Sequence, residues 1–535
     1  MRIGTEMPEQ DWACQKCCRG LYSCYWGQRS NRKQRFACFW FAIVSLVSLL
    51  ALFWMYVCLV ALNDHDDVNW KAFSLLMKWI NWFNWFMVMV IISALLTIYC
   101  CLLLLFALFQ VALGEPLDLH WLHKALLFLV VIVIAVGITG ISTMWEREWA
   151  TVRLSLQATA PFLQLGAVVA LTLLSWLVFQ RVLMTRSAVS RRLTLLLFVV
   201  VSIAIFLCPL FITSPCLLEK LPPRPALVGH RGAPMLAPEN TMMSFRRGVE
   251  CGLIAFETDV QLSKNGVPFL LHDNKGQFLL RTTNVNEVYK DQKYYSSSQV
   301  TWKELQTLNA GKWFIKSDPF GTVASLSEQE VAEAQNQSLP ALSELLELAK
   351  EHNVSVVFDM KNDSPDSNDT HHTVQAILRS NISADLVLWL PPIHRAYVKK
   401  TAPGFRHVYA DATKMFNESG NQLNIRYSEL GTEQIHELKS RNISVNLWVV
   451  NEPWLFSLLW CSGASSVTTN ACHRFKDMTE PVWRLSPSTY KIIWISVDVG
   501  SLVVMMAIFL LQRKLESRDR TVRRNENELH PFLHE

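Results

Sequence analysis

Six long apolar runs dominate the hydropathy pattern of this chain, with one long, mainly polar region between the fifth and the sixth. A bilayer core about 30 Å thick requires roughly 20 apolar residues per helix. The pattern therefore predicts membrane spans at 38–62, 86–113, 124–144, 160–180, 193–213 and 490–512. Gly137, Gly140 and Pro161 lie within or beside the third and fourth spans, which leaves a re-entrant or buried segment as the alternative there. The spans hold almost no central ionisable residues, which favours an anchor over a transporter.

Short apolar runs alternate with helical patterns in the polar region. The runs predict strands at 226–230, 254–261, 354–361, 385–390, 406–409, 423–427, 443–450 and 465–469. Helices are expected near 240–251, 341–352, 370–380, 393–401, 432–441 and 453–461. Eight strands alternating with helices indicate an α/β domain of the (β/α)8 TIM-barrel type, with a doubly wound sheet as the alternative. Residues 275–340 break the alternation and predict an insertion after the second strand, either a lid or a subdomain that shapes the substrate site.

Composition and charge place this barrel relative to the membrane. The chain is 51% hydrophobic and 18% charged, which excludes an ordinary soluble protein of 535 residues. Arginines and lysines gather before the first span, between the fourth and fifth, and after the sixth, so these segments are expected in the cytosol. The net charge of +5 is therefore mostly juxtamembrane and implies no nucleic-acid partner.

The resulting organisation is an α-helical membrane protein with six spans and an extracellular barrel, expected in the plasma membrane with both termini cytosolic. Its parts are a cytosolic N-terminal tail (1–37), five spans (38–213), the barrel domain (214–489), the sixth span (490–512) and a basic cytosolic tail (513–535).

Asn-x-Ser/Thr sequons point to the same topology. All of them lie between the fifth and sixth spans, and the one at Asn362 is the weakest because Pro365 follows its serine. We expect N-glycosylation of the other six, at Asn336, Asn353, Asn368, Asn381, Asn417 and Asn442.

The 13 cysteines do not form a disulfide scaffold. Four lie in the polar region and are able to pair in an oxidising compartment, and Cys461 with Cys472 is one candidate pair. A second group, Cys14, Cys17, Cys18 and Cys24, precedes the first span. Its position suggests reversible acylation or redox control, with unmodified thiols as the alternative.

The candidate chemistry lies at the carboxyl ends of the first predicted strands. His230-Arg231-Gly232 places an imidazole and a guanidinium at the end of the first strand, and a second histidine follows at His272-Asp273. Imidazoles transfer protons, and arginine binds phosphate oxygens. A structural histidine is the usual explanation for a single His, but two such groups within 46 residues favour a catalytic pair.

Acidic residues complete this set. Glu257 and Asp259 are two apart on one strand, so both side chains point to the same face, and Asp359 and Lys361 repeat the spacing on the third strand. Two buried carboxylates repel each other, and a bound cation relieves that repulsion. The residues therefore predict a divalent metal site, Mg²⁺ or Ca²⁺, with Glu257, Asp259 and Asp359 as ligands. Lys361 is expected to contact a substrate phosphate. The set is typical of metal-assisted hydrolysis of a phosphodiester.

His230-Arg-Gly, Pro238-Glu-Asn-Thr241, Glu257-x-Asp259, Gly266 and His272-Asp273 together resemble the glycerophosphodiester phosphodiesterase family, over residues 225–475. The six spans further resemble the animal six-transmembrane surface subgroup of that family. The resemblance implies hydrolysis of glycerophosphodiesters such as glycerophosphoinositol or glycerophosphocholine, with His230 and His272 as the acid/base pair and Arg231 and Lys361 on the phosphate. It also implies attack of the glycerol 2-hydroxyl on phosphorus, through a cyclic phosphate that water opens.

Two positions depart from the family pattern. The family usually has Glu where this chain has Asp359, and many members read Thr-Asp where it has Thr469-Asn470. Either change is expected to loosen the metal or alter its identity. Two alternatives stay open: release of GPI-anchored surface proteins, which the membrane tether suits because the barrel is held near membrane lipid, and a catalytically dead, receptor-like barrel.

Overall fold

The computed structural model describes most of the chain in two compact units. The described residues are 20–24, 36–63, 82–113, 117–144, 146, 148–185, 187–274, 278–290, 296–361, 367–482 and 484–529. One unit, the helical unit, comprises Met1–Ser214 with Ser486–Glu535, and the other, the barrel unit, comprises Pro215–Leu485. The expected thiol group at Cys14, Cys17 and Cys18 and the weak sequon at Asn362 lie outside the described residues.

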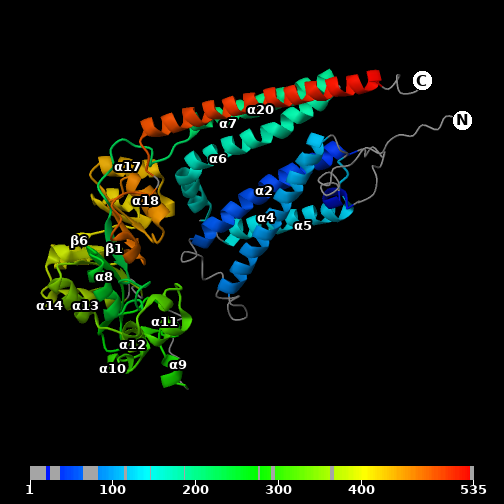
Figure 1. Cartoon of the computed structure of the whole chain (residues 1–535). Coiled ribbons are helices and arrows are strands. Elements are labelled where there is room, and N and C mark those ends of the chain that lie inside the picture. Colours follow the sequence, from blue (N-terminus) through cyan, green and yellow to red (C-terminus); the bar gives the residue numbers. More distant parts are fainter. Residues whose placement is uncertain are drawn as a thin grey trace. The chain divides into compact units, whose positions relative to one another are not determined.

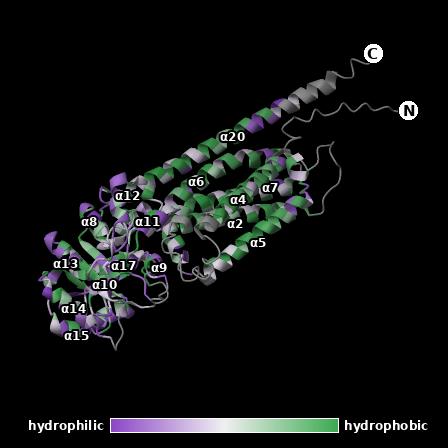
Figure 2. Cartoon of the chain, turned by 90° about the horizontal axis from the view of Figure 1, so that it is seen from below, coloured by the Kyte–Doolittle hydropathy of each residue, from purple (hydrophilic) through white to green (hydrophobic). Residues whose placement is uncertain are grey.

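The helical unit holds six helices long and apolar enough to cross a membrane, one for each predicted span. They are α2 (Ala37–Asn63), α4 (Trp82–Leu113), α5 (Trp121–Met144), α6 (Glu148–Met184), α7 (Ala188–Leu207) and α20 (Pro487–Leu529). The fourth span is one continuous helix of 37 residues with Pro161 inside it, so the re-entrant alternative is wrong there. Apolar residues extend along these helices in Figure 2, as expected for lipid-facing surfaces.

Polar side chains join neighbouring helices of this unit. Trp54 Nε1 on α2 donates to Ser93 Oγ on α4 at 3.1 Å, and Ser48 Oγ donates to the Cys100 carbonyl at 2.9 Å. In an apolar environment such bonds between helices contribute on average about 0.6 kcal/mol each. They hold α2 against α4, which is the most extensive contact between helices of the unit.

The barrel unit is built on eight parallel strands, as the alternation of elements predicts. They are β1 (Ala226–His230), β2 (Ala255–Leu262), β4 (Ser355–Met360), β5 (Val387–Trp389), β6 (Arg406–His407), β7 (Gln422–Arg426), β8 (Ser444–Trp448) and β9 (Ser466–Thr469). Their order is β6-β5-β4-β2-β1-β9-β8-β7, and a parallel bridge between Tyr409 and Leu423 joins the two ends. The sheet therefore closes as a barrel, and the doubly wound alternative is wrong.

Helices follow the strands around this barrel (Figure 1). They are α8 (Met242–Glu250), α13 (Leu342–Glu351), α14 (Asp369–Arg379), α15 (Arg395–Thr401), α16 (Ala412–Asn417), α17 (Thr432–Ser440), α18 (Pro453–Cys461) and α19 (Cys472–Phe475). Apolar residues on the inward face of α13, for example Leu342, Leu345 and Leu346, are fully buried. A short ninth strand, β3 (Pro268–Leu270), pairs antiparallel with β2, and the hydropathy pattern did not predict it.

The insertion between β3 and β4 carries short helices: α9 (Val285–Val288), α10 (Trp302–Leu305), α11 (Lys312–Ser317) and α12 (Glu328–Gln335). Two apolar clusters attach it to the barrel. Phe278 and Leu305 pack with Phe269 of β3, and Phe314 packs with Met243 of α8. This packing favours the shaping subdomain over the lid, because a lid would have to leave these buried contacts.

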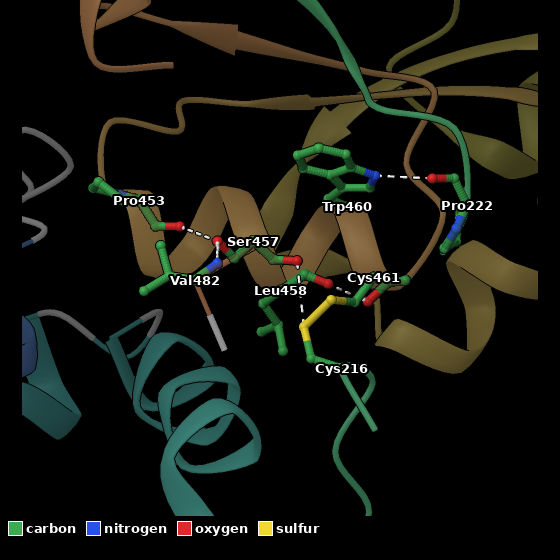
Figure 3. The surroundings of a disulfide bond; sticks show 9 residues. Cys216, Pro222, Pro453, Ser457, Leu458, Trp460, Cys461 and Val482 are labelled. Carbon is green, nitrogen blue, oxygen red and sulfur yellow. Dashed lines mark hydrogen bonds between the residues drawn. A yellow bond between two sulfur atoms is a disulfide. The ribbon is translucent and has the colours of Figure 1, made fainter. Parts of the chain in front are cut away.

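Two disulfides cross the barrel unit, and the predicted Cys461–Cys472 pair is wrong. Cys216 bonds to Cys461, and Cys251 bonds to Cys472. Figure 3 shows the first, which holds the segment entering the unit against α18, where Trp460 Nε1 also donates to the Pro222 carbonyl at 2.9 Å. Cys461 and Cys472 lie at the ends of different helices, on either side of β9, so spacing along the chain did not indicate which thiols meet.

The Cys216–Cys461 bond closes a sequence separation of 245 residues, so it restricts the unfolded chain strongly. We expect Cys216→Ser/Cys461→Ser to lower the free energy of unfolding of the barrel unit by about 2–4 kcal/mol. Denaturant titration of the detergent-solubilised chain, followed by tryptophan fluorescence, measures this change. Cys208→Ser, which removes an exposed free thiol, is the control. An unchanged midpoint in the double variant would contradict the prediction.

Candidate active site

Four predicted site residues come together because three strands are adjacent and parallel. His230 ends β1 and pairs in register with Glu257 on β2, and Asp259 on β2 pairs with Asp359 on β4. The carboxyl ends of parallel barrel strands meet at one rim, where barrel enzymes carry their active sites. Side chains separated by up to 129 positions in the sequence thus share one small region of the rim.

Glu257, Asp259 and Asp359 form a cluster that is able to hold a cation. One oxygen from each lies within 4.8 Å of the others, and Glu257 and Asp259 are buried. Burial and the neighbouring Asp259 raise the pKa of Glu257 to about 8. Among the described residues, lysine and arginine side chains contact Asp259 and Asp359 but not the Glu257 carboxylate, and three hard oxygen donors are the ligands that Mg²⁺ and Ca²⁺ prefer. The residues therefore fit a divalent metal ion.

Lys361 lies beside the same cluster. Its Nζ is 2.8 Å from Asp259 Oδ1 and 2.6 Å from Asp359 Oδ2. Burial disfavours the charged amine, but the two carboxylates outweigh it and raise the pKa of Lys361 above its ordinary value. Burial would likewise raise the pKa of Asp259, but Lys361, His272 and Arg231 hold it well below the ordinary range. The lysine is thus charged and the aspartate ionised at neutral pH.

His230 is held by Asn470, which follows β9. The two side chains meet through His230 Nδ1 and Asn470 Oδ1 at 2.7 Å, so Nδ1 carries the proton and Nε2 keeps a lone pair. Burial and the adjacent Arg231 lower the pKa of His230 to about 3. A neutral imidazole with a free nitrogen is suited to accept a proton. Asn470 therefore lies against the histidine, and its effect on the metal stays a prediction.

His272 is held by the neighbouring Asp273. Its Nδ1 lies 2.9 Å from Asp273 Oδ1, and Arg281 Nε donates to the other oxygen of Asp273 at 2.7 Å. Burial would raise the pKa of Asp273, but the bonds from His272 and the charge of Arg281 lower it below its ordinary value. The ionised carboxylate fixes the tautomer of His272 and leaves Nε2 for proton transfer.

Arg231 is anchored by Glu239, from the Pro238-Glu-Asn-Thr241 motif. Arg231 Nη1 donates to Glu239 Oε1 at 3.1 Å, and Arg281 donates to both oxygens of the same carboxylate. Burial would raise the pKa of Glu239, but the two arginines bring it down to about 2. Arg231 itself has a left-handed backbone (φ 55°), a strained conformation that functional sites often contain.

Gly232 makes room for this turn. Its φ is 91°, and a Cβ there would lie 2.5 Å from Ser244 Oγ, which itself receives the Ala233 N–H. Only glycine adopts this positive φ without strain and also leaves the space beside Ser244 free.

Arg281 is the site residue that the motifs did not indicate. It belongs to the insertion, and the ring of Trp313 on α11 lies 5.4 Å from its guanidinium carbon. No spacing along the chain links it to Glu239, 42 positions earlier. The only hint in the sequence was that the acidic residues Glu239 and Asp273 had no predicted basic partner.

A closed parallel barrel that carries a cluster of three carboxylates, two imidazoles and a guanidinium defines a (β/α)8-barrel phosphodiesterase. Residues 230–478 match the profile of the Glycerophosphoryl diester phosphodiesterase family. The chain is also 45% identical to glycerophosphoinositol inositolphosphodiesterase GDPD2 of Mus musculus, over 95% of each chain. It belongs to the glycerophosphodiester phosphodiesterase family, as the motifs predicted, and is an enzyme that hydrolyses glycerophosphodiesters.

The chain is also similar to other proteins. Glycerophosphodiester phosphodiesterase domain-containing protein 5 of Gallus gallus is 39% identical, over 93% of this chain and 84% of that relative. The structure of an Oleispira antarctica phosphodiesterase in complex with the product sn-glycerol-3-phosphate is 21% identical over 47% of this chain and 96% of its own, with a TM-score of 0.38.

Proposed function

We propose that this protein is a membrane-anchored ecto-phosphodiesterase that hydrolyses glycerophosphoinositol or glycerophosphocholine outside the cell. The observation that carries the proposal is the grouping of His230, Arg231 and the carboxylate cluster at one rim, with His272 close enough to act electrostatically on Asp259 and His230. The name of the mouse relative favours glycerophosphoinositol of the two substrates.

In this proposal, His230 Nε2 removes the proton from the glycerol 2-hydroxyl as its oxygen attacks phosphorus. The bond from phosphorus to the leaving alcohol breaks, His272 donates the proton that this alcohol needs, and a cyclic phosphate forms. Water then opens the ring with the two histidines in reversed roles. Arg231 and Lys361 contact the phosphate oxygens, whose negative charge grows in the transition state.

Glu257, Asp259 and Asp359 would hold the divalent cation, which when bound supplies positive charge to the same oxygens. The aspartate at 359 is one methylene shorter than the family's usual glutamate, yet its oxygens still reach the cluster.

Three features support an extracellular barrel. The six helices suit a membrane anchor, and the two disulfides are typical of oxidising compartments. The sequon asparagines that we propose as glycosylation sites are all exposed, at Asn336, Asn353, Asn368, Asn381, Asn417 and Asn442.

Intact cells that express the chain provide the test, supplied with each of the two substrates with and without EDTA. We expect product in the medium, its loss with chelator, and recovery when Mg²⁺ or Ca²⁺ is returned. Absence of product, with the protein verified at the cell surface, would overturn the proposal. Shedding of a GPI-anchored reporter under those conditions would then favour anchor cleavage, and no shedding would favour the receptor-like barrel.

A further inference from the structure

Gln261 is a buried amide on β2 that no step of the proposed mechanism uses. It follows Glu257 and Asp259 at intervals of two residues, so the three side chains point to the same face of the strand. Gln261 is fully buried. A buried amide is costly unless it is hydrogen-bonded, so the groups that it contacts indicate its role.

The Gln261 amide holds the backbone on both sides of His272. Its Nε2 donates to the Leu271 carbonyl at 2.8 Å and to the Asp273 carbonyl at 2.7 Å. Leu271 and Asp273 immediately precede and follow His272. The two N–H groups of one side-chain amide therefore fix the backbone at both ends of the histidine.

A backbone hydrogen bond connects the same 271–273 segment to β2. The Leu271 N–H donates to the Asp259 carbonyl at 3.0 Å, directly beyond the antiparallel pairing of β2 with β3. Asp259 is also a member of the carboxylate cluster. Together with the two bonds from Gln261, this bond relates the position of His272 to the strand that carries two of the proposed metal ligands.

The ring of His272 is held separately from its backbone. Asp273 contacts Nδ1 of the ring, and Arg281 Nε donates to the Asp273 carboxylate. These bonds set the tautomer and the orientation of the ring. Gln261 and Arg281 thus hold different parts of the segment: Gln261 bonds to its backbone, and Arg281 bonds to the carboxylate that orients the imidazole.

We propose that Gln261 positions His272 for proton transfer to the leaving alcohol. The inference rests on the proposed function, in which His272 is the general acid. Proton transfer requires the donor nitrogen within hydrogen-bond distance of the leaving oxygen, and a displacement of about 1 Å costs up to about 10²-fold in rate. Gln261 is therefore a positioning residue that acts through His272.

Gln261→Met tests this role, because methionine keeps much of the length and volume of the side chain but removes both donors. We expect kcat for glycerophosphoinositol to fall by roughly 10–100-fold with little change in KM, the range typical of residues that orient catalytic groups. Gln329→Met is the matched control, because Gln329 is an exposed glutamine of α12, and its kcat should be unchanged. The measurement is steady-state hydrolysis by the full chain at the cell surface, normalised to surface-labelled protein.

A second substrate separates the positioning of an acid from a general loss of structure. In the glycerophosphodiester of p-nitrophenol, the leaving group departs without a proton, so a general acid contributes little to breaking its bond to phosphorus. We expect Gln261→Met to release p-nitrophenol at a rate close to that of the unmodified chain, in single-turnover mixtures of the detergent-solubilised chain. A purely structural role predicts the same fractional loss with both substrates.

A double variant tests whether Gln261 acts through the histidine. Gln261→Met/His272→Ala should hydrolyse glycerophosphoinositol about as slowly as His272→Ala alone, because the positioning effect has no target once the imidazole is removed. Independent contributions would instead multiply.

Equal fractional losses with the two substrates, or losses that multiply in the double variant, would overturn the proposal. Gln261→Asn, which keeps an amide on a side chain one methylene shorter, is a second variant and should retain more activity than Gln261→Met. Failure of both variants to reach the cell surface would show a role in folding and would also contradict the proposal. Failure of the proposed function is distinguishable, because the unmodified chain would then hydrolyse neither substrate.

Discussion

His230→Ala and His272→Ala should each lower kcat of the phosphodiesterase by about 10²–10⁴-fold, the usual contribution of a general acid or base. His230 is held with Nε2 free by Asn470, and His272 is held with Nε2 free by Asp273. Alanine keeps the strand and the turn but removes the only proton-transfer group at that position. Steady-state hydrolysis of glycerophosphoinositol by surface-expressed variants measures the loss.

His352→Ala is the matched control for this experiment. His352 is an exposed histidine at the end of α13, on the helix-to-strand side of the barrel, so its removal should leave kcat unchanged. Surface labelling checks that each variant is folded and delivered. Turnover by His230→Ala close to that of the unmodified chain would exclude its role as acid or base.

Arg281→Met should lower kcat by roughly 10–100-fold with a smaller change in KM, the range typical of residues that orient catalytic groups. Arg281 bonds to Asp273, which orients His272, and to Glu239, which anchors Arg231. Methionine keeps much of the length and apolar volume but removes every donor. The carboxylates of Asp273 and Glu239 then lose a hydrogen-bond partner. The side chains that they hold in place, His272 and Arg231, become more mobile.

The same substitution should reduce stability. The Glu239 and Asp273 side chains are 7% and 11% exposed, whereas Arg281 is 37% exposed. Loss of one partner of a fully buried ion pair costs about 3–5 kcal/mol, and here the cost should be lower because Arg281 is partly solvated and Arg231 still pairs with Glu239.

Arg281→Lys separates the catalytic effect from the structural one. Lysine restores the positive charge, but it lacks the forked guanidinium that bonds to Asp273 and Glu239 together. Compared with Arg281→Met, this variant should therefore regain more of the lost stability than of the lost kcat. Arg246→Met is the control, because Arg246 is an exposed arginine whose nearest carboxylate, on Glu333, lies 3.8 Å away. A wild-type kcat in Arg281→Met would contradict the positioning role.

The sequence predicted much of the fold because local patterns carry it. The predicted first strand coincides with β1, Ala226–His230, and the eighth differs from β9 by one residue. Both are short, buried runs rich in β-branched or aliphatic residues, which favour strands, so they are recognisable without tertiary information. The strand β3 and the helices α16 and α19 were missed because each is only three to six residues long, too short to show a period.

The motif residues of the site were also readable from the sequence. His230 ends β1, and Glu257 and Asp259 lie within β2, in register with His230 and with Asp359 of β4, so the parallel pairing brings these side chains together. The partner of His230 was not predicted, although the first and last strands of a closed barrel are neighbours. Asn470 directly follows β9, lies 240 positions later in the sequence, and contacts His230 through its side chain.

By itself, then, the sequence determined the six long apolar helices, the barrel, the acidic cluster and the two histidines that we propose as the acid/base pair, because hydropathy and short motifs are patterns of neighbouring residues. Only the tertiary structure decided that Cys216 bonds to Cys461 and that Arg281 joins His272 to Arg231 through Asp273 and Glu239. Each of these depends on which loops meet at a rim or on a helix surface. Such contacts depend on the packing of the whole barrel, so they cannot be predicted from a local sequence pattern.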